Sequence, residues 1–107
     1  MIIYNVTINV DQSIHEEWIT WIKEHIPQVL ATGKFTEAKL TKVLLEEEMG
    51  GTTYSVQYRA KSRKDLDAYY REYADKLRQD GLTKFADKAL TFRTELEIID
   101  EYSITFN

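Results

Sequence analysis

The stretch Ile2-Ile3-Tyr4-Asn5-Val6-Thr7-Ile8-Asn9-Val10 is the part of the chain that decides the fold. Apolar side chains occupy every second position, and this alternation is typical of a strand that buries one face and exposes the other. After a polar break, the apolar residues of 13–30 recur at helical spacing, and residues 35–45 alternate again. The first half of the chain is therefore predicted to form a strand, an amphipathic helix and a returning strand.

The second half repeats this order of elements. Residues 53–60 and 90–99 are predicted strands, and residues 63–80 are a predicted helix between them. The Gly50-Gly51 pair suits the positive φ angles of a tight hairpin. The order βαββαβ predicts an α+β, ferredoxin-like fold, in which two helices cover one face of a four-stranded antiparallel sheet. Because no linker composition interrupts the 107 residues, we expect a single domain over residues 1–107.

The composition excludes several classes of protein. The formal net charge is -4, and the basic residues between positions 61 and 88 alternate with acidic ones, so the clustered cations that bind a nucleic-acid backbone are missing. There is no cysteine for a disulfide or a thiolate nucleophile. No run of about 18 apolar residues could span a membrane, and no signal-peptide pattern occurs at the start. We therefore expect a cytoplasmic protein with no nucleic-acid or membrane partner.

Two helices cover only one face of such a sheet, which leaves the other face open. The apolar registers assign Tyr4, Tyr54 and Phe92, each with its alternating neighbours, to the helix side. The opposite registers are polar, and three alternatives remain for them: contact with water, with nucleic acid, or with the same face of a second copy. We favour the last, a dimeric α/β barrel held by pairs of opposite charge. The predicted interface residues are Asn5, Glu37, Lys39, Gln57, Arg59, Arg93 and Glu95.

Several stretches resemble a bacterial family that is known only as a domain of unknown function. These stretches are Tyr4-Asn5-Val6-Thr7, residues 18–27, residues 30–35 and residues 50–58. The chain looks like a member of the dimeric α/β-barrel superfamily, whose relatives include antibiotic-biosynthesis and haem-degrading monooxygenases. The resemblance implies a homodimer and a cavity for a small molecule, and it implies no particular reaction.

The residues of this chain can be compared one by one with those that the haem-degrading relatives use to bind haem. The haem-degrading relatives use an Asn on the first strand, which Asn5 matches in position, together with a Trp and a His from the second helix region. Residues 63–88 contain neither Trp nor His. The proximal ligand and its neighbour are therefore missing, and we expect no haem and no other cofactor.

A site without a cofactor is predicted beside the apolar stripe of the first helix. His25 lies on this stripe, where a histidine either bonds to a backbone carbonyl or is available as a general base. The candidate catalytic residues are Asn5, His25 and Tyr58. Aromatic residues at helical spacing usually belong to a core, but they can also line a pocket. The candidate ligand-binding residues are Trp21, Tyr54 and Tyr73.

No metal site is expected. His15 and His25 are ten residues apart, which is not a helical metal-ligand spacing, and the run Glu46-Glu47-Glu48 is interpreted as a solvated strand end. Two functions remain open. One is a homodimeric small-molecule-binding or structural protein without catalysis. The other is a cofactor-free monooxygenase or isomerase with a pocket between the helices and the sheet.

Overall fold

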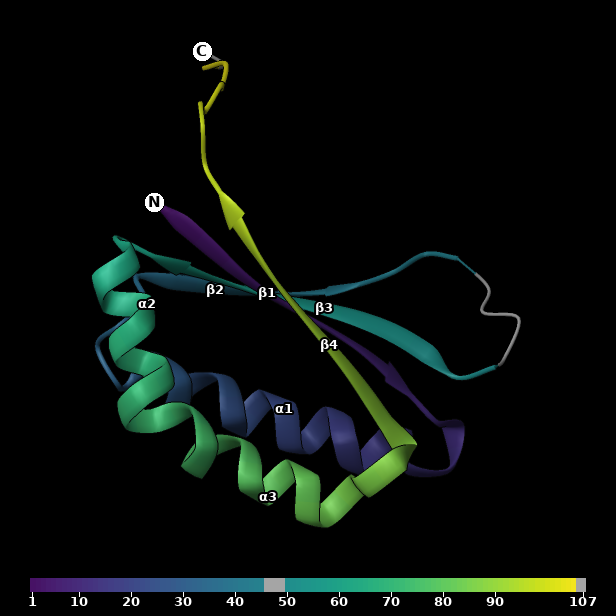
Figure 1. Cartoon of the computed structure of the whole chain (residues 1–107). Helices are drawn as coiled ribbons and strands as arrows, with labels where there is room; N and C mark the ends of the chain where they lie inside the picture. The colour runs from purple at the N-terminus through teal and green to yellow at the C-terminus, as the bar shows by residue number, and fades with distance from the viewer. Residues whose placement is uncertain (46–49, 106–107) are drawn as a thin grey trace.

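The computed structural model describes residues 1–45 and 50–105 of the chain. Its main elements are β1 (Ile2–Val10), α1 (His15–Leu30), β2 (Glu37–Lys42), β3 (Thr52–Ala60), α2 (Arg63–Tyr69), α3 (Asp75–Phe85) and β4 (Ala89–Glu97). The strands form one antiparallel sheet of order β2-β3-β1-β4, and the helices lie together on one of its faces (Figure 1). The predicted ferredoxin-like fold is confirmed. The acidic run Glu46-Glu47-Glu48 lies outside the described residues.

The core lies between the sheet and the helices. Its buried residues form one cluster, in which Trp18 of α1 and Leu66 of α2 meet the inward side chains of β1 and β3. Burying one large apolar side chain of this kind stabilises the fold by about 1.5–3 kcal/mol. The inward registers predicted for β1 and β3 are confirmed, because alternate residues of both strands are buried. No helix in the described part of the chain combines the length and the apolar character that a membrane span requires.

The edge strand β4 has a register that differs from the prediction. Glu95 lies directly opposite the buried Tyr4 of β1, so Glu95 and Arg93 point to the helix side. Phe92 and Leu96, which were expected in the core, lie on the outer face and are 67% and 45% exposed. The prediction that Arg93 and Glu95 belong to the outer face is therefore wrong. A shift of one residue reverses every side chain of a strand, and solvent at a sheet edge lets long polar side chains take the inward positions.

The second helical region contains a π-helical turn and runs further than predicted. The turn spans Tyr70–Ala74, and α3 continues through Gly81 instead of ending at residue 80. A π turn adds one residue to the helical period. Ala74 is therefore buried, at 1% exposed, whereas Tyr73, which was predicted to bind a ligand, is 37% exposed.

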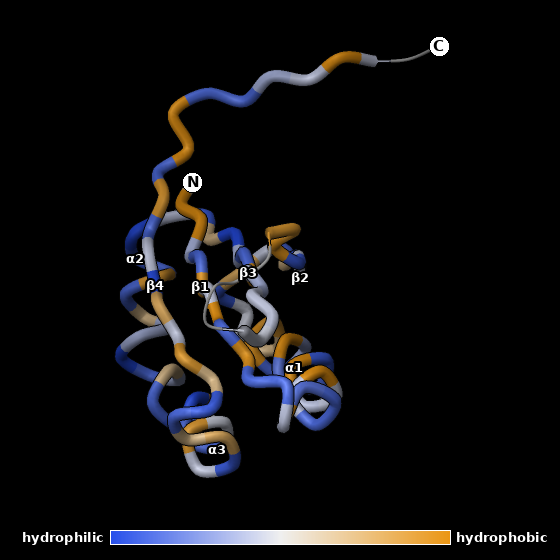
Figure 2. The backbone as a smooth tube through the Cα atoms, turned by 90° about the vertical axis from the view of Figure 1, so that its right-hand side faces the viewer, coloured by the Kyte–Doolittle hydropathy of each residue, from blue (hydrophilic) through white to orange (hydrophobic). Residues whose placement is uncertain are grey.

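Beyond β4 the chain leaves the body of the molecule. The C-terminal tail, defined as residues 99–105, extends away from the sheet and carries hydrophobic as well as hydrophilic residues (Figures 1 and 2). Ile99, Tyr102 and Ile104 are all exposed there. The described strands, in contrast, keep their large apolar residues on the helix side, except along β4 and at Ile3 of β1.

Candidate functional site

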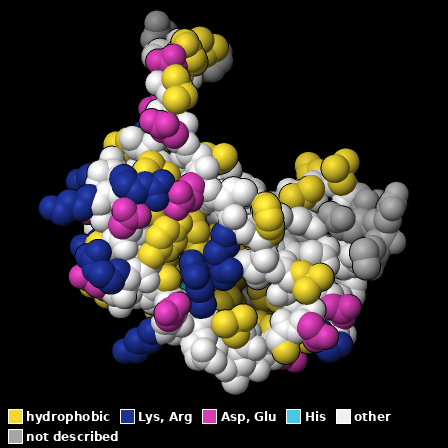
Figure 3. Space-filling model, in the orientation of Figure 1, with side chains coloured by type: hydrophobic (Ala, Val, Ile, Leu, Met, Phe, Trp, Pro, Cys, Tyr) yellow, Lys and Arg dark blue, Asp and Glu magenta, His cyan; other side chains and the backbone are white. Residues whose placement is uncertain are grey.

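A cavity of about 80 Å³ lies between the helices and the sheet. Inward side chains of β1 and β3 form its floor, and α1, α3 and the helix-facing side of β4 form its walls. Leu82 and Arg93 line the cavity and are exposed, so they mark its mouth. The space-filling view shows a hollow between β4 and α3, with hydrophobic side chains inside it and basic side chains at its rim (Figure 3). We call this space the helix–sheet cavity.

Trp21 of α1 forms one wall of the helix–sheet cavity. Its indole Nε1–H donates to a carboxylate oxygen of Asp80 at 2.7 Å, and the imidazole of His25 stacks on it with ring centroids 4.4 Å apart. Gly81 permits this position, because a Cβ atom there would stand 2.7 Å from Cη2 of the indole. The Trp21 indole is therefore held in place by a hydrogen bond to a carboxylate, by the stacked ring of His25 and by the backbone of α3 at Gly81.

His25 faces the helix–sheet cavity from the same helix. The pKa of its imidazole is lowered to about 4, mainly by burial; the negative charge of Asp80 opposes this shift, and the positive charge of Arg93 adds a smaller lowering. The ring forms no hydrogen bond with any residue that the structure describes. At neutral pH the imidazole is therefore uncharged, with one N–H donor and one nitrogen acceptor available to a ligand.

Two buried tyrosines also line the cavity. The hydroxyls of Tyr58 and Tyr69 have no hydrogen-bond partner among the described residues. Every fully buried polar side-chain atom in the described part of the chain does have a partner. These two hydroxyl oxygens are therefore not fully buried, and each is in contact with open space. Burial raises the pKa of Tyr69 to about 12 and raises the pKa of Tyr58 as well. Both phenols therefore stay protonated at neutral pH and can donate.

Two arginines complete the site. Arg78 of α3 donates from Nη2 to the hydroxyl of Tyr4 at 2.6 Å, and its guanidinium carbon lies 6.0 Å from the centroid of the Tyr70 ring. Arg93 of β4 lies at the mouth. Within the described ranges, neither arginine takes part in an ion pair, whereas Arg59 and other arginines do. The cavity is therefore bordered by two positive charges that no carboxylate of the described chain neutralises.

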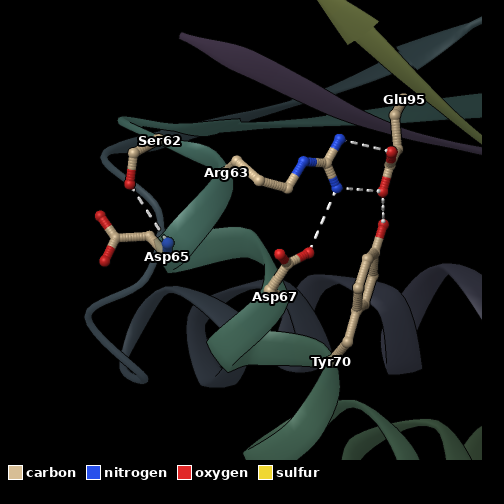
Figure 4. A network of polar contacts seen from close by, with 6 residues as sticks. All are labelled: Ser62, Arg63, Asp65, Asp67, Tyr70 and Glu95. Carbon is tan, nitrogen blue, oxygen red and sulfur yellow. Dashed lines mark hydrogen bonds and ion pairs between the residues drawn. The ribbon is translucent and has the colours of Figure 1, made fainter.

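A separate polar network ties β4 to α2 beside this site (Figure 4). The guanidinium of Arg63 donates two hydrogen bonds to Glu95, at 2.7 and 3.1 Å, and a third to Asp67 at 3.3 Å. The hydroxyl of Tyr70 donates to the same Glu95 carboxylate at 2.6 Å. These donors, Arg63 first, lower the pKa of Glu95. Glu95 thus serves to fix the edge strand and is not free for an interface on the outer face.

The structure separates the predicted catalytic residues. His25 and Tyr58 both line the helix–sheet cavity, but Asn5 lies on the opposite face of the sheet. Its side-chain amide accepts from the Ser55 hydroxyl at 2.6 Å and donates to Thr94 Oγ1 at 3.2 Å. The strand alternation in the sequence already predicts that Asn5 and Tyr58 lie on different faces of the sheet. Grouping them in one catalytic site was therefore inconsistent with that pattern.

The predicted ligand-binding residues are also divided. Trp21 lines the cavity, whereas Tyr54 is buried beside Trp18, with ring centroids 5.0 Å apart, and its hydroxyl lies 2.6 Å from Nε2 of His15. Tyr73 points away because of the π turn. Neither Tyr54 nor Tyr73 lines the cavity within the described residues.

Sequence reasoning missed Arg78 as a site residue. A signal was present, because Arg78 lies four residues after the buried Ala74 and therefore follows the apolar face of the helix. Tyr69 was not among the predicted site residues either. No group of three or more His, Asp or Glu that could hold a metal ion occurs in the described part of the chain.

The outer face of the sheet retains the other predicted interface residues. Glu37, Lys39, Gln57 and Arg59 lie on this face, across β2 and β3. Arg59 already pairs with Glu37 at 3.6 Å and with Glu101 of the tail. Its charge is therefore compensated within its own chain.

Fold and cavity together define the class, an α+β protein of ferredoxin-like fold with a pocket between its helices and its sheet. The chain belongs to the family described as Domain of unknown function (DUF4286), whose family model matches residues 1–99. The family resemblance drawn from the sequence is confirmed. No functionally curated protein matches the chain significantly.

Solved structures share the fold at low sequence identity. A dimeric ferredoxin-like protein from an uncultured marine organism gives a TM-score of 0.65 at 12% identity, over 94% of this chain and 97% of the other. A candidate antibiotic biosynthesis monooxygenase from Deinococcus radiodurans gives 0.61 at 11% identity, over 99% and 100%. A de novo designed protein with a ferredoxin fold gives 0.50 at 16% identity, over 99% and 94%. At these identities the likeness establishes the fold alone.

Proposed function

We propose that this protein is a homodimeric small-molecule-binding protein and that its ligand enters the helix–sheet cavity. The observation that carries the proposal is the combination of aromatic walls with polar groups that are open to the cavity. Trp21 supplies a flat apolar surface, and His25, Tyr58 and Tyr69 supply donors or acceptors with no partner in the described chain. An apolar pocket with a few convergent polar groups is the usual form of a ligand site.

The size of the cavity limits what it can enclose. Pockets that bury a drug-sized ligand measure roughly 300–1,000 Å³, and an engineered cavity of about 150 Å³ holds benzene. The 80 Å³ present here is smaller. A ligand must therefore be small, or must leave one end at the mouth between Leu82 and Arg93.

A pair of bulky substitutions on β4 tests the proposal. Thr91 lines the cavity, so Thr91→Trp should fill it, whereas Glu97→Trp places the same side chain on the same face about 20 Å further along the strand. Amide NMR spectra of the wild type, recorded with a set of anionic, cationic and neutral small molecules, should show saturable shifts near Trp21 that Thr91→Trp abolishes and Glu97→Trp retains. The absence of any saturable shift, or binding that survives in Thr91→Trp, would refute the cavity as the ligand site.

Dimer formation is proposed through the outer face of the sheet. Leu90, Phe92 and Leu96 form an exposed apolar row along β4, beside the half-buried Ile3 and Asn5 of β1. Such a row on a sheet that the helices leave uncovered suits a second copy of this chain. The solved relative that is a dimeric ferredoxin-like protein supports this choice. Apolar contact along β4 replaces the charge pairs expected from the sequence, since Arg93 and Glu95 face the helices.

Two neighbouring substitutions test the dimer. Phe92→Glu introduces a charge on the outer face, and Thr91→Glu introduces the same charge on the helix side of the same strand. Light scattering at tens of micromolar protein should give a dimer mass for the wild type and for Thr91→Glu, and a monomer mass for Phe92→Glu. A monomeric wild type would refute the dimer.

Binding is preferred to catalysis because of the state of His25. A general base works best when its pKa lies near the working pH, and the pKa of His25 is about 4. The monooxygenase or isomerase alternative stays a prediction, which rests on His25 and Tyr58 facing one cavity.

A further inference from the structure

We propose that the ligand of the helix–sheet cavity is a small organic carboxylate with an apolar body. This inference rests on the proposed function and adds the chemical class of the ligand to it. The apolar body would lie against Trp21 and Phe85, and the carboxylate would lie at the mouth, between Arg78 and Arg93.

The charge around the cavity is the first argument. The chain carries a net charge of -4, yet the described residues that line the cavity include Arg78 and Arg93 and no Asp or Glu. Of the acids beside the site, Glu95 is paired with Arg63 of α2 and accepts from Tyr70, and Asp80, which accepts the indole N–H of Trp21, is not among the lining residues. An anion would therefore meet two positive charges that lack a counter-charge in the described chain.

The geometry of Arg78 is the second argument. One of its five N–H groups donates to the hydroxyl of Tyr4 at 2.6 Å, and its guanidinium lies over the Tyr70 ring at 6.0 Å. The side chain is thus held in place by uncharged groups, and its remaining donors stay available. A planar guanidinium fork matches the two oxygens of a carboxylate.

The remaining lining favours a carbon skeleton over a bare anion. Trp21, Leu82 and Phe85 are apolar surfaces at or inside the cavity, and the protonated hydroxyls of Tyr58 and Tyr69 add neutral donors. Inorganic phosphate would use the arginines and leave these surfaces without a partner. A hydrocarbon body attached to one carboxylate uses both parts of the lining.

Benzoate, benzamide and inorganic phosphate are suitable probes. Benzamide has the shape of benzoate without the charge, so the ratio of the two dissociation constants isolates the contribution of the anion. A hydrogen bond to a charged group contributes roughly 10- to 100-fold in affinity, and because Arg93 is exposed we expect a value near tenfold. NMR titration of the wild type should therefore give benzoate about ten times tighter than benzamide, and phosphate weaker than benzoate.

Arg93→Gln should reduce the preference for benzoate to less than threefold. Arg71→Gln is the matched control, because it removes the same charge from an exposed arginine outside the cavity lining and should leave the ratio unchanged. Arg93 is exposed, so its substitution should preserve the fold, which an unchanged melting temperature verifies.

The outcomes separate this inference from the proposed function. Equal binding of benzoate and benzamide, or phosphate as tight as benzoate, would overturn the carboxylate and leave the cavity as a ligand site. Equal loss of preference in Arg71→Gln and Arg93→Gln would also overturn it, because the effect would then be one of net charge. No saturable binding by any small molecule would overturn both proposals.

Discussion

Replacing Gly81 by alanine tests whether Trp21 packs against α3 as closely as the structure shows. A Cβ atom at this position would lie 2.7 Å from Cη2 and 2.8 Å from Cζ2 of the Trp21 indole. The indole is held where it is, because Asp80 accepts its N–H at 2.7 Å and His25 stacks on the ring at 4.4 Å. The added methyl group must therefore displace the ring or the helix.

Two effects of opposite sign determine the magnitude. Alanine favours the helix over glycine by about 1 kcal/mol. Overpacking costs about 1–3 kcal/mol, and a weakened hydrogen bond from Trp21 to Asp80 costs about 1 kcal/mol more. We expect Gly81→Ala to lower the free energy of unfolding by about 1–3 kcal/mol, which corresponds to a fall in melting temperature of at least several degrees.

The assay is urea unfolding, followed by circular dichroism, in two backgrounds. In the Trp21→Phe background the six-membered ring of the indole is gone, so the clash disappears and only the helix preference remains. There, Gly81→Ala should stabilise the protein by up to about 1 kcal/mol, and the sign of the effect should reverse. If alanine raised the stability in both backgrounds, the packing of Trp21 against Gly81 would be refuted.

Three further predictions concern single side chains. His25 should titrate near pH 4 by NMR. Its pKa in the unfolded chain is higher, near 6.5, so the unfolded state binds the proton first and wild-type stability should fall as the pH drops from 6.5 toward 4. The variant His25→Gln should lack this pH dependence. Tyr69→Ala should cost about 3–5 kcal/mol in chemical denaturation and Tyr73→Ala less than 1 kcal/mol, since only the first ring is buried; similar costs at both positions would contradict the π turn. Tyr70→Phe should remove the 2.6 Å hydrogen bond to Glu95, cost about 1 kcal/mol and raise the carboxyl pKa in an NMR titration, and an unchanged pKa would argue against the network.

The fold could be predicted because its signals are local. Period-two alternation in residues 2–10 and 53–60, and helical spacing in residues 13–30, each depend on neighbours within a few positions. The cavity could be predicted only in part. Trp21 and His25 were found because both lie on the apolar stripe of α1, whereas Arg78 was missed because arginine is seldom expected on such a stripe.

The amino-acid sequence alone was enough to predict six elements, their order along the chain and the buried faces of β1 and β3. The reason is that apolar residues recur in the sequence at the period of the strand or helix that buries them. Two features depended on contacts between distant residues. The face that each β4 side chain takes follows from its pairing with β1, where Tyr4 meets Glu95, and a one-residue shift would exchange Arg93 with Phe92. The cavity arises where α3, turned by the π-helical segment, leaves space above the sheet that Trp21 borders but does not fill. No stretch of sequence records either feature, because each is decided by which surfaces meet after the elements have formed.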